Sequence, residues 1–107
     1  MSSDDFYFRA ECENGRIVPD PSEDVIFILM ENLNSSDNTF VILEPKDAEE
    51  GWYVSIARRP RGGFEVEFRD PVTREHEIEV MRDKSRSATK ITLWVAGRPA
   101  VARRRAF

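Results

Sequence analysis

Three segments decide the fold of this chain, and they read WYVSIARR at 52–59, FEVEFR at 64–69 and EHEIEVM at 75–81. In each of them apolar and polar residues alternate, which is the pattern of a β-strand that buries one face. The linkers PRGG and DPVT, at 60–63 and 70–73, contain the proline, glycine and aspartate residues that favour turns. The region therefore predicts consecutive antiparallel strands, that is, a meander with one buried face.

The alternation also predicts which side chains share a face of this sheet. On the inward face we expect Trp52, Val54, Ile56, Phe64, Val66, Phe68, His76, Ile78 and Val80. On the outward face we expect Arg69 and five glutamates, Glu65, Glu67, Glu75, Glu77 and Glu79. If the last two strands pair around a turn at 71–73, Glu67 lies opposite Glu77 and Glu65 opposite Glu79.

The part of the chain before the meander predicts a hairpin, a helix and a further strand. An aromatic-rich strand is expected at 6–11, the Asn14-Gly15 pair favours a tight turn, and 16–18 returns beside the first strand. The further strand is expected at 39–43, where the sequence is rich in β-branched and aromatic residues. It joins the meander as its first member.

The helix is expected from Pro21 to about residue 32 or 33. Asp20 can cap it, Pro21 suits the first helical position, and Glu23 stands where a capping box has its acid. One broad apolar face contains Val25, Ile26, Leu29, Met30 and Leu33. Phe27 and Ile28 project on opposite flanks, so either other parts of the domain or a partner must cover them.

The C-terminal part admits two interpretations. Ser85 can cap a helix over 85–96 that Gly97 ends, but the same stretch also alternates as a strand would. Its length and its framing by a cap and a glycine favour the helix. Residues 100–107 are rich in arginine and are expected to form a basic tail. The sequence thus predicts one α+β domain at 1–99, an antiparallel meander sheet with one or two helices packed on one face.

Composition restricts where the protein acts. The chain has 107 residues and one cysteine, so no internal disulfide can form and a reducing, cytoplasmic location is expected. Its longest apolar run has six residues, whereas a membrane span needs about 20. The N-terminal residues MSSDD are acidic, unlike the start of a signal peptide. We therefore expect no membrane partner.

Charge is distributed unevenly along the chain. Residues 1–50 contain 13 acids and three bases, a net charge of −10. Residues 51–107 contain seven acids and 13 bases, a net charge of +6. Halves of opposite sign either attract each other within the fold or present an acidic and a basic surface to different partners.

The residues that usually carry catalysis are few. His76 is the only histidine and is expected to pack in the sheet, and Cys12 has no histidine near it in sequence. A zinc site needs about four ligands, mostly cysteine and histidine, and the chain has two such residues. Gly62 and Gly63 lie between two strands, so they do not form a phosphate-binding loop before a helix. We therefore expect no enzyme activity, no cofactor and no metal.

The five outward glutamates, Glu65, Glu67, Glu75, Glu77 and Glu79, form the surface on which we first expect a partner. Like charges directly opposite each other across two strands destabilise a sheet. A protein tolerates this cost either because the charges keep a strand edge from aggregating or because a basic partner docks there.

A second hypothesis uses the basic C-terminal half. It predicts a small nucleic-acid-binding or regulatory module that works through Arg58, Arg59 and Arg61 and through the arginines at 103–105. The chain as a whole carries a net charge of −4, and few aromatic residues accompany these arginines. A solvated tail is therefore the favoured interpretation, and nucleic acid is not expected as the partner.

The order of the segments resembles the small immunity proteins of bacterial polymorphic toxin and contact-dependent inhibition systems. The resemblance covers most of 6–99: an early hairpin, a helix entered as DPSEDV at 20–25, a meander starting at Trp52 with a turn at 62–63, and a last amphipathic segment ending in GRP at 97–99. It implies a protein that binds a cognate toxin made by the same cell and blocks its active site or an adjacent surface. An acidic patch suits a basic toxin such as a nuclease. Binding residues vary within these proteins, so the resemblance assigns no role to a particular residue.

Overall fold

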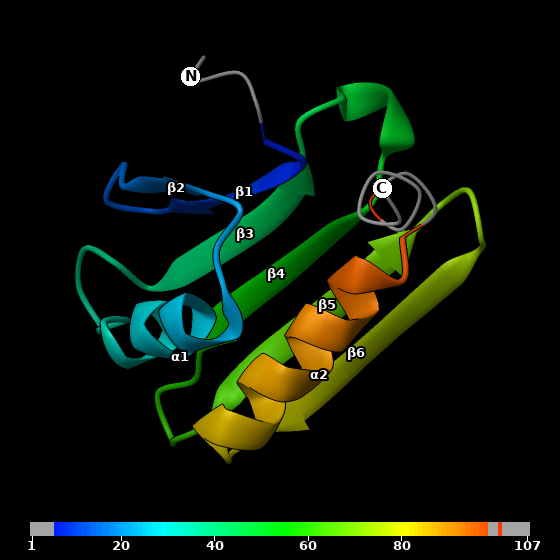
Figure 1. The fold of residues 1–107 in the computed structure, drawn as a ribbon. Coiled ribbons are helices and arrows are strands. Elements are labelled where there is room, and N and C mark those ends of the chain that lie inside the picture. Colours follow the sequence, from blue (N-terminus) through cyan, green and yellow to red (C-terminus); the bar gives the residue numbers. More distant parts are fainter. Residues whose placement is uncertain (1–5, 99–100, 102–107) are drawn as a thin grey trace.

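The computed structural model describes residues 6–98 and Val101. Six strands form one antiparallel sheet in the order β2-β1-β3-β4-β5-β6, and two helices lie against the same face of it (Figure 1). The strands are β1 Phe8–Cys12, β2 Ile17–Pro19, β3 Phe40–Pro45, β4 Tyr53–Arg58, β5 Phe64–Asp70 and β6 Glu75–Met81. The helices are α1 Glu23–Glu31 and α2 Lys84–Ala96, with a short 3-10 turn, η1 Ala48–Glu50. The predicted α+β class and meander order are confirmed.

Helix α1 begins two residues later than predicted, because Ser22 and not Asp20 is its cap. The Ser22 hydroxyl accepts a hydrogen bond from the backbone amide of Val25 at 3.2 Å. Asp20 adopts a φ of +44°, and its carboxylate accepts hydrogen bonds from the backbone amides of Tyr7 and Phe8. Asp20 therefore ties the start of β1 to the chain that enters the helix.

Residues 85–96, whose sequence is compatible with a helix or a strand, belong to helix α2. Its cap is Asp83, whose carboxylate accepts the backbone amide of Arg86 at 3.0 Å, so the expectation that Ser85 caps it is wrong. Gly97 follows the last turn as predicted. Of the predicted tail at 100–107, only Val101 is among the described residues, and it is buried.

The core lies between the sheet and the helices. Six of the predicted inward residues are buried there: Trp52, Val54, Ile56, Phe64, Val66 and Phe68. Helix α1 contributes Ile26, Leu29, Met30 and Leu33, and helix α2 contributes Ala88, Ile91 and Val95. Phe27 is partly buried against this core, so the domain itself covers it, whereas Ile28 stays 46% exposed.

Strand β6 pairs with β5 one residue away from the predicted register. Glu77 lies opposite Phe68, and Ile78 lies opposite Glu67. Because side chains alternate along a strand, a shift by one residue moves all of them to the other face. The inward prediction is therefore wrong for three residues of β6, which point away from the helices: His76, Ile78 and Val80.

The turn between the two strands accounts for this register. Asp70 pairs with Glu75, so the loop has four residues, one more than the predicted turn at 71–73. The Asp70 carboxylate accepts the backbone amides of Val72 and Thr73. Arg74 adopts a φ of +64°, a left-handed conformation that returns the chain into β6. The longer loop thereby turns the glutamates of β6 toward α2.

Candidate protein-binding surface

The structure separates the five glutamates predicted to bind a partner into two sets on opposite faces of the sheet. Glu65 and Glu67 on β5 point away from the helices. Glu75, Glu77 and Glu79 on β6 lie on the helix side. The predicted oppositions of Glu67 with Glu77 and of Glu65 with Glu79 do not occur. A continuous glutamate surface is therefore absent from this hairpin.

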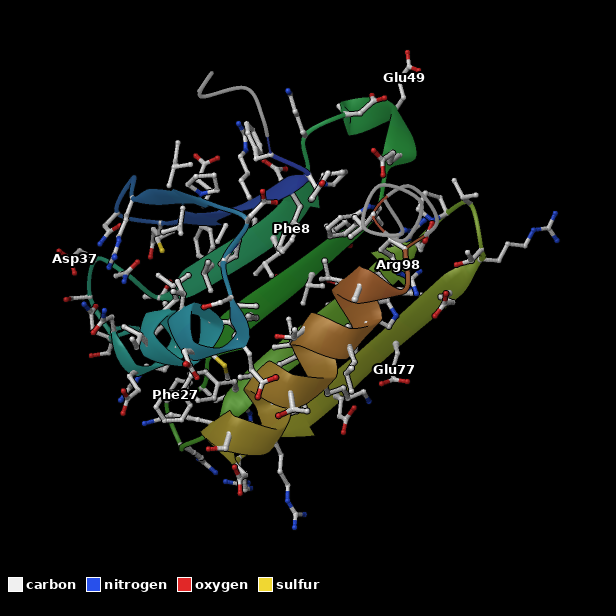
Figure 2. The ribbon with its side chains drawn as sticks, viewed as in Figure 1. Phe8, Phe27, Asp37, Glu49, Glu77 and Arg98 are labelled. Atoms are coloured by element: carbon white, nitrogen blue, oxygen red, sulfur yellow. The ribbon has the colours of Figure 1, made fainter. Side chains whose placement is uncertain are left out.

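Two of the helix-side glutamates, Glu77 and Glu79, form ion pairs with Lys90 of α2. The Lys90 ammonium donates to Glu77 Oε1 at 2.6 Å and also contacts Glu79 Oε2. The hydrogen bond from Lys90 lowers the pKa of Glu77, and the same contacts raise the pKa of Lys90. Figure 2 shows Glu77 projecting from β6 on the side of α2. These charges hold the helix on the edge strand.

The third helix-side glutamate belongs to a cluster around Arg98. The Arg98 guanidinium donates through Nη1 to Asp70 Oδ2 at 2.6 Å and to Glu75 Oε1 at 2.9 Å, and its centre lies 3.7 Å from that of the Trp94 ring. The Trp94 indole N–H donates to the other oxygen of Glu75 at 3.1 Å. The hydrogen bond from Arg98 is the main cause that lowers the pKa of Glu75. This glutamate, too, is engaged in structural contacts.

The other side of the sheet carries neither helix, and we call it the open face (Figure 1). The strand pairing places its side chains in rows that run across all six strands. They are Arg9, Glu11, Ile17, Phe40, Ile42, Glu44, Tyr53, Ser55, Ala57, Glu65, Glu67, Arg69, His76, Ile78 and Val80.

Apolar side chains extend across the open face. Phe40 and Ile42 on β3 are half-buried between their neighbours. Toward the two edges, Ile17 is 54% exposed, Ile78 57% and Val80 47%. Complete burial of a fully exposed side chain of this kind gains about 1.5–3 kcal/mol. These side chains are already about half covered, so a partner on this face gains a part of that free energy from each of them.

Carboxylates outnumber basic groups on the same face. Four of them stand in its rows: Glu11, Glu44, Glu65 and Glu67. Among the described residues, the guanidinium groups there are those of Arg9 and Arg69. Arg9 donates to Glu44 Oε1 through both Nη2, at 2.8 Å, and Nε, at 3.1 Å. The open face is therefore negatively charged overall.

A shallow hollow of about 260 Å³ lies on the open face along β1 and β3. Phe40 and Ile42 line it together with the carboxylates of Glu11, Glu13 and Glu44. Two hydrogen bonds from Thr39, each 2.7 Å, lower the pKa of Glu13. Apolar lining with carboxylates beside it suits a lysine or arginine side chain, whose stem is apolar and whose end is charged.

His76, which was expected to pack inward, forms a pair with Glu67 on the open face. Its Nε2 lies 2.7 Å from Glu67 Oε2, and this hydrogen bond is the main cause that lowers the pKa of Glu67. Burial, followed by the hydrogen bond to Glu67, raises the pKa of Tyr53. The hollow lies on β1 and β3, and β4 separates it from Glu67 on β5. The hydrogen bonds of Glu67 with His76 and Tyr53 fix these side chains beside Ile78.

Other chemistry finds little support in the described residues. Cys12 is buried, and burial raises the pKa of its thiol, which disfavours the reactive thiolate. Within 6–98 and Val101, no three side chains of histidine, cysteine, aspartate or glutamate converge as metal ligands. Neither α1 nor α2 has the length and apolar character needed to cross a membrane.

The basic residues of the alternative hypothesis are only partly described. Arg58 and Arg61 are exposed near the turn between β4 and β5. Arg59 is half-buried, and its Nη1 donates to the carbonyl of Gly62 at 3.5 Å. The arginines at 103–105 lie outside the described residues.

Sequence reasoning missed the carboxylates that the first half of the chain supplies to the open face: Glu11, Glu13 and Glu44. The signal that could have found them is the net charge of −10 over residues 1–50. It was too coarse to select them, because only strand pairing between β1 and β3 brings them together.

No protein-family model, curated protein or solved structure matches this chain.

Proposed function

We propose that this chain is a protein-binding domain without catalytic activity, and that its partner covers the open face. The observation that carries the proposal is a six-stranded face without a helix, on which apolar side chains lie among an excess of carboxylates. The complementary surface on the partner is apolar and rich in lysine or arginine.

The specific form that we propose is an immunity protein, which binds a cognate bacterial toxin in the cytoplasm of the cell that makes both. The order of elements supports this form, and the charge of the open face supports a basic toxin such as a nuclease. Complementary charge accelerates the encounter and disfavours wrong partners. When the toxin is bound across the sheet, this chain covers the toxin's active site or the surface beside it.

A nucleic-acid partner fits the open face poorly. Nucleic-acid binding depends on lysine and arginine that neutralise phosphates. The open face instead presents glutamates beside the two arginines, and one of these, Arg9, is already bound to Glu44.

The test uses the product of the gene next to that of this protein as the candidate toxin. We expect the wild-type protein to restore growth of cells that produce this toxin and to bind it in stopped-flow experiments. Glu65→Lys reverses an exposed charge of β5 on the open face, and Glu49→Lys reverses one on η1 (Figure 2). We expect about tenfold slower association and weaker salt dependence for Glu65→Lys only, because charged residues at an interface act mainly on the association rate.

The outcomes separate the two parts of the proposal. A neighbouring gene product that is neither toxic nor bound contradicts the immunity function. Binding that both substitutions leave equally fast removes the open face from consideration while the partnership itself stands.

A further inference from the structure

The two edges of the sheet differ in a way that bears on partner binding. Edge strand β2 has three residues and ends at Pro19, so it offers little backbone for pairing. Edge strand β6 has seven residues, contains neither proline nor glycine, and pairs with β5 without a bulge. Strand β6 lies at the edge of the sheet (Figure 1), and in the described part of the chain no backbone hydrogen bond joins it to anything except β5. Natural proteins usually shorten, bend, cover or charge such an edge, and of these devices β6 has the charged side chains of Glu75, Glu77 and Glu79.

The side chains of β6 give this edge two different faces. On the open face, Ile78 and Val80 are β-branched and about half exposed. On the helix side, Glu75, Glu77 and Glu79 point toward α2. Lys90 contacts both Glu77 and Glu79, and Arg98 contacts both Glu75 and Asp70, so these contacts set two cations against four carboxylates.

A second copy of this chain is a poor occupant of the edge. Two-fold symmetric pairing of antiparallel edge strands keeps the faces of both sheets aligned. It therefore sets glutamates of β6 against glutamates of the other copy, and like charges directly opposite each other are destabilising. The edge rejects self-association and favours a strand of opposite charge.

We propose that β6 accepts an extended segment of the partner protein as a seventh strand, and that this segment alternates lysine or arginine with apolar residues. Its basic side chains lie beside the glutamates on the helix side, and its apolar side chains pack against Ile78 and Val80. The identity of the partner rests on the proposed function; the mode of binding rests on the edge itself.

At this edge, strand addition accounts both for the affinity and for the selection of the partner segment. Main-chain hydrogen bonds along seven residues supply affinity without regard to sequence. Side chains that alternate between the two faces supply the selection. A partner bound in this way also extends the open face by one strand, so that the rest of its body lies over the acidic surface.

The experiment titrates the full chain, labelled with ¹⁵N, with the synthetic peptide acetyl-Lys-Val-Lys-Val-Lys-Val-Lys-amide and records amide shifts and amide hydrogen exchange. We expect the largest shifts in β6 and slower exchange of those β6 amides that do not pair with β5. The same peptide with glutamate in place of lysine is the charge control. We expect it to bind at least about tenfold more weakly, because it opposes the glutamates of β6.

Two variants keep the test specific to the edge. Ile78→Lys places a charge on the apolar face of β6, and Ile28→Lys makes the same change on the outside of α1. We expect Ile78→Lys to lower the affinity for the lysine peptide about tenfold and Ile28→Lys to leave it unchanged. Shifts without slower exchange in β6, equal binding of both peptides, or no binding at all would overturn strand addition. None of these results depends on the candidate toxin, whose binding and growth assays test the proposed function separately.

Discussion

Arg98 connects three elements through a guanidinium that is almost completely buried. Its side chain is 7% exposed and that of Asp70 is 2% exposed, so both charges have been removed from water. Removing one member of such a pair leaves the other as a buried charge without its partner, which is more costly than losing a surface ion pair.

Replacement of this residue tests that argument. We expect Arg98→Ala to lower the free energy of unfolding by about 3–5 kcal/mol, because the Asp70 carboxylate loses its cation. The double variant Arg98→Ala with Asp70→Asn should recover part of the loss, since the amide is neutral and its oxygen can still accept from Val72. Urea denaturation of the three proteins is the measurement. A loss below about 1 kcal/mol in the single variant would contradict a structural role for the cluster.

At the scale of elements, the hairpin of β5 and β6 has one strand inside the sheet and one at its edge. Both alternate strictly in sequence, yet only β5 buries its apolar side chains. Phe68 is 1% exposed and lies beside Trp94, with 5.4 Å between the ring centroids, whereas Ile78 is 57% exposed. Burial of the apolar side chains therefore stabilises the fold through β5 much more than through β6.

A matched pair of truncations tests this register. We expect Phe68→Ala to cost about 3–5 kcal/mol, because it leaves a cavity in a packed core. Ile78→Ala should cost less than about 1 kcal/mol, as an ordinary surface change does. Chemical denaturation of both variants gives the two values. Comparable losses would mean that Ile78 faces the core and that β6 is shifted by one residue.

At the scale of the whole molecule, stability depends on ionised groups distributed over both faces of the sheet. Hydrogen bonds lower the pKa of Glu13, Glu67, Glu75 and Glu77 below the ordinary value of 4.5. Such groups stabilise the fold above that value, and the contribution disappears as the pH falls through their folded pKa. Lys90 has a raised pKa, so its contribution is complete below 10.5 and is lost above the folded pKa.

We therefore expect stability to be nearly constant between about pH 5.5 and 9 and to fall below about pH 4.5. Lys90→Met should destabilise the protein at pH 7 and have a smaller effect at pH 3, because the contribution of the Glu77 carboxylate declines as the pH falls through its folded pKa. The matched control is Lys84→Met, because Lys84 makes only a 3.9 Å contact with Glu31. The measurement is the urea midpoint of all three proteins at both pH values. An effect of Lys90→Met that is the same at both would contradict the proposed bridge between α2 and β6.

Much of this architecture was determined by local sequence. The strands β4 and β5, the turn between them and the inward position of Phe68 followed from alternation, because both strands lie inside the sheet and one face must be apolar. The existence of α1 followed from its apolar face, although Ser22 rather than Asp20 caps it. Of the predicted surface, Glu65 and Glu67 are on the open face, as alternation required.

The tertiary structure alone decided which way β6 faces and hence which glutamates share a surface. At an edge, an alternating strand can turn either set of side chains toward the helices, and local propensity is the same for both. A four-residue loop and the cations Lys90 and Arg98, which come from a later part of the chain, selected the arrangement with glutamates beneath α2. Pairing of β1 with β3 added Glu11 and Glu44 to the open face. Contacts between residues far apart in sequence cannot be inferred from periodicity, since periodicity describes one element at a time.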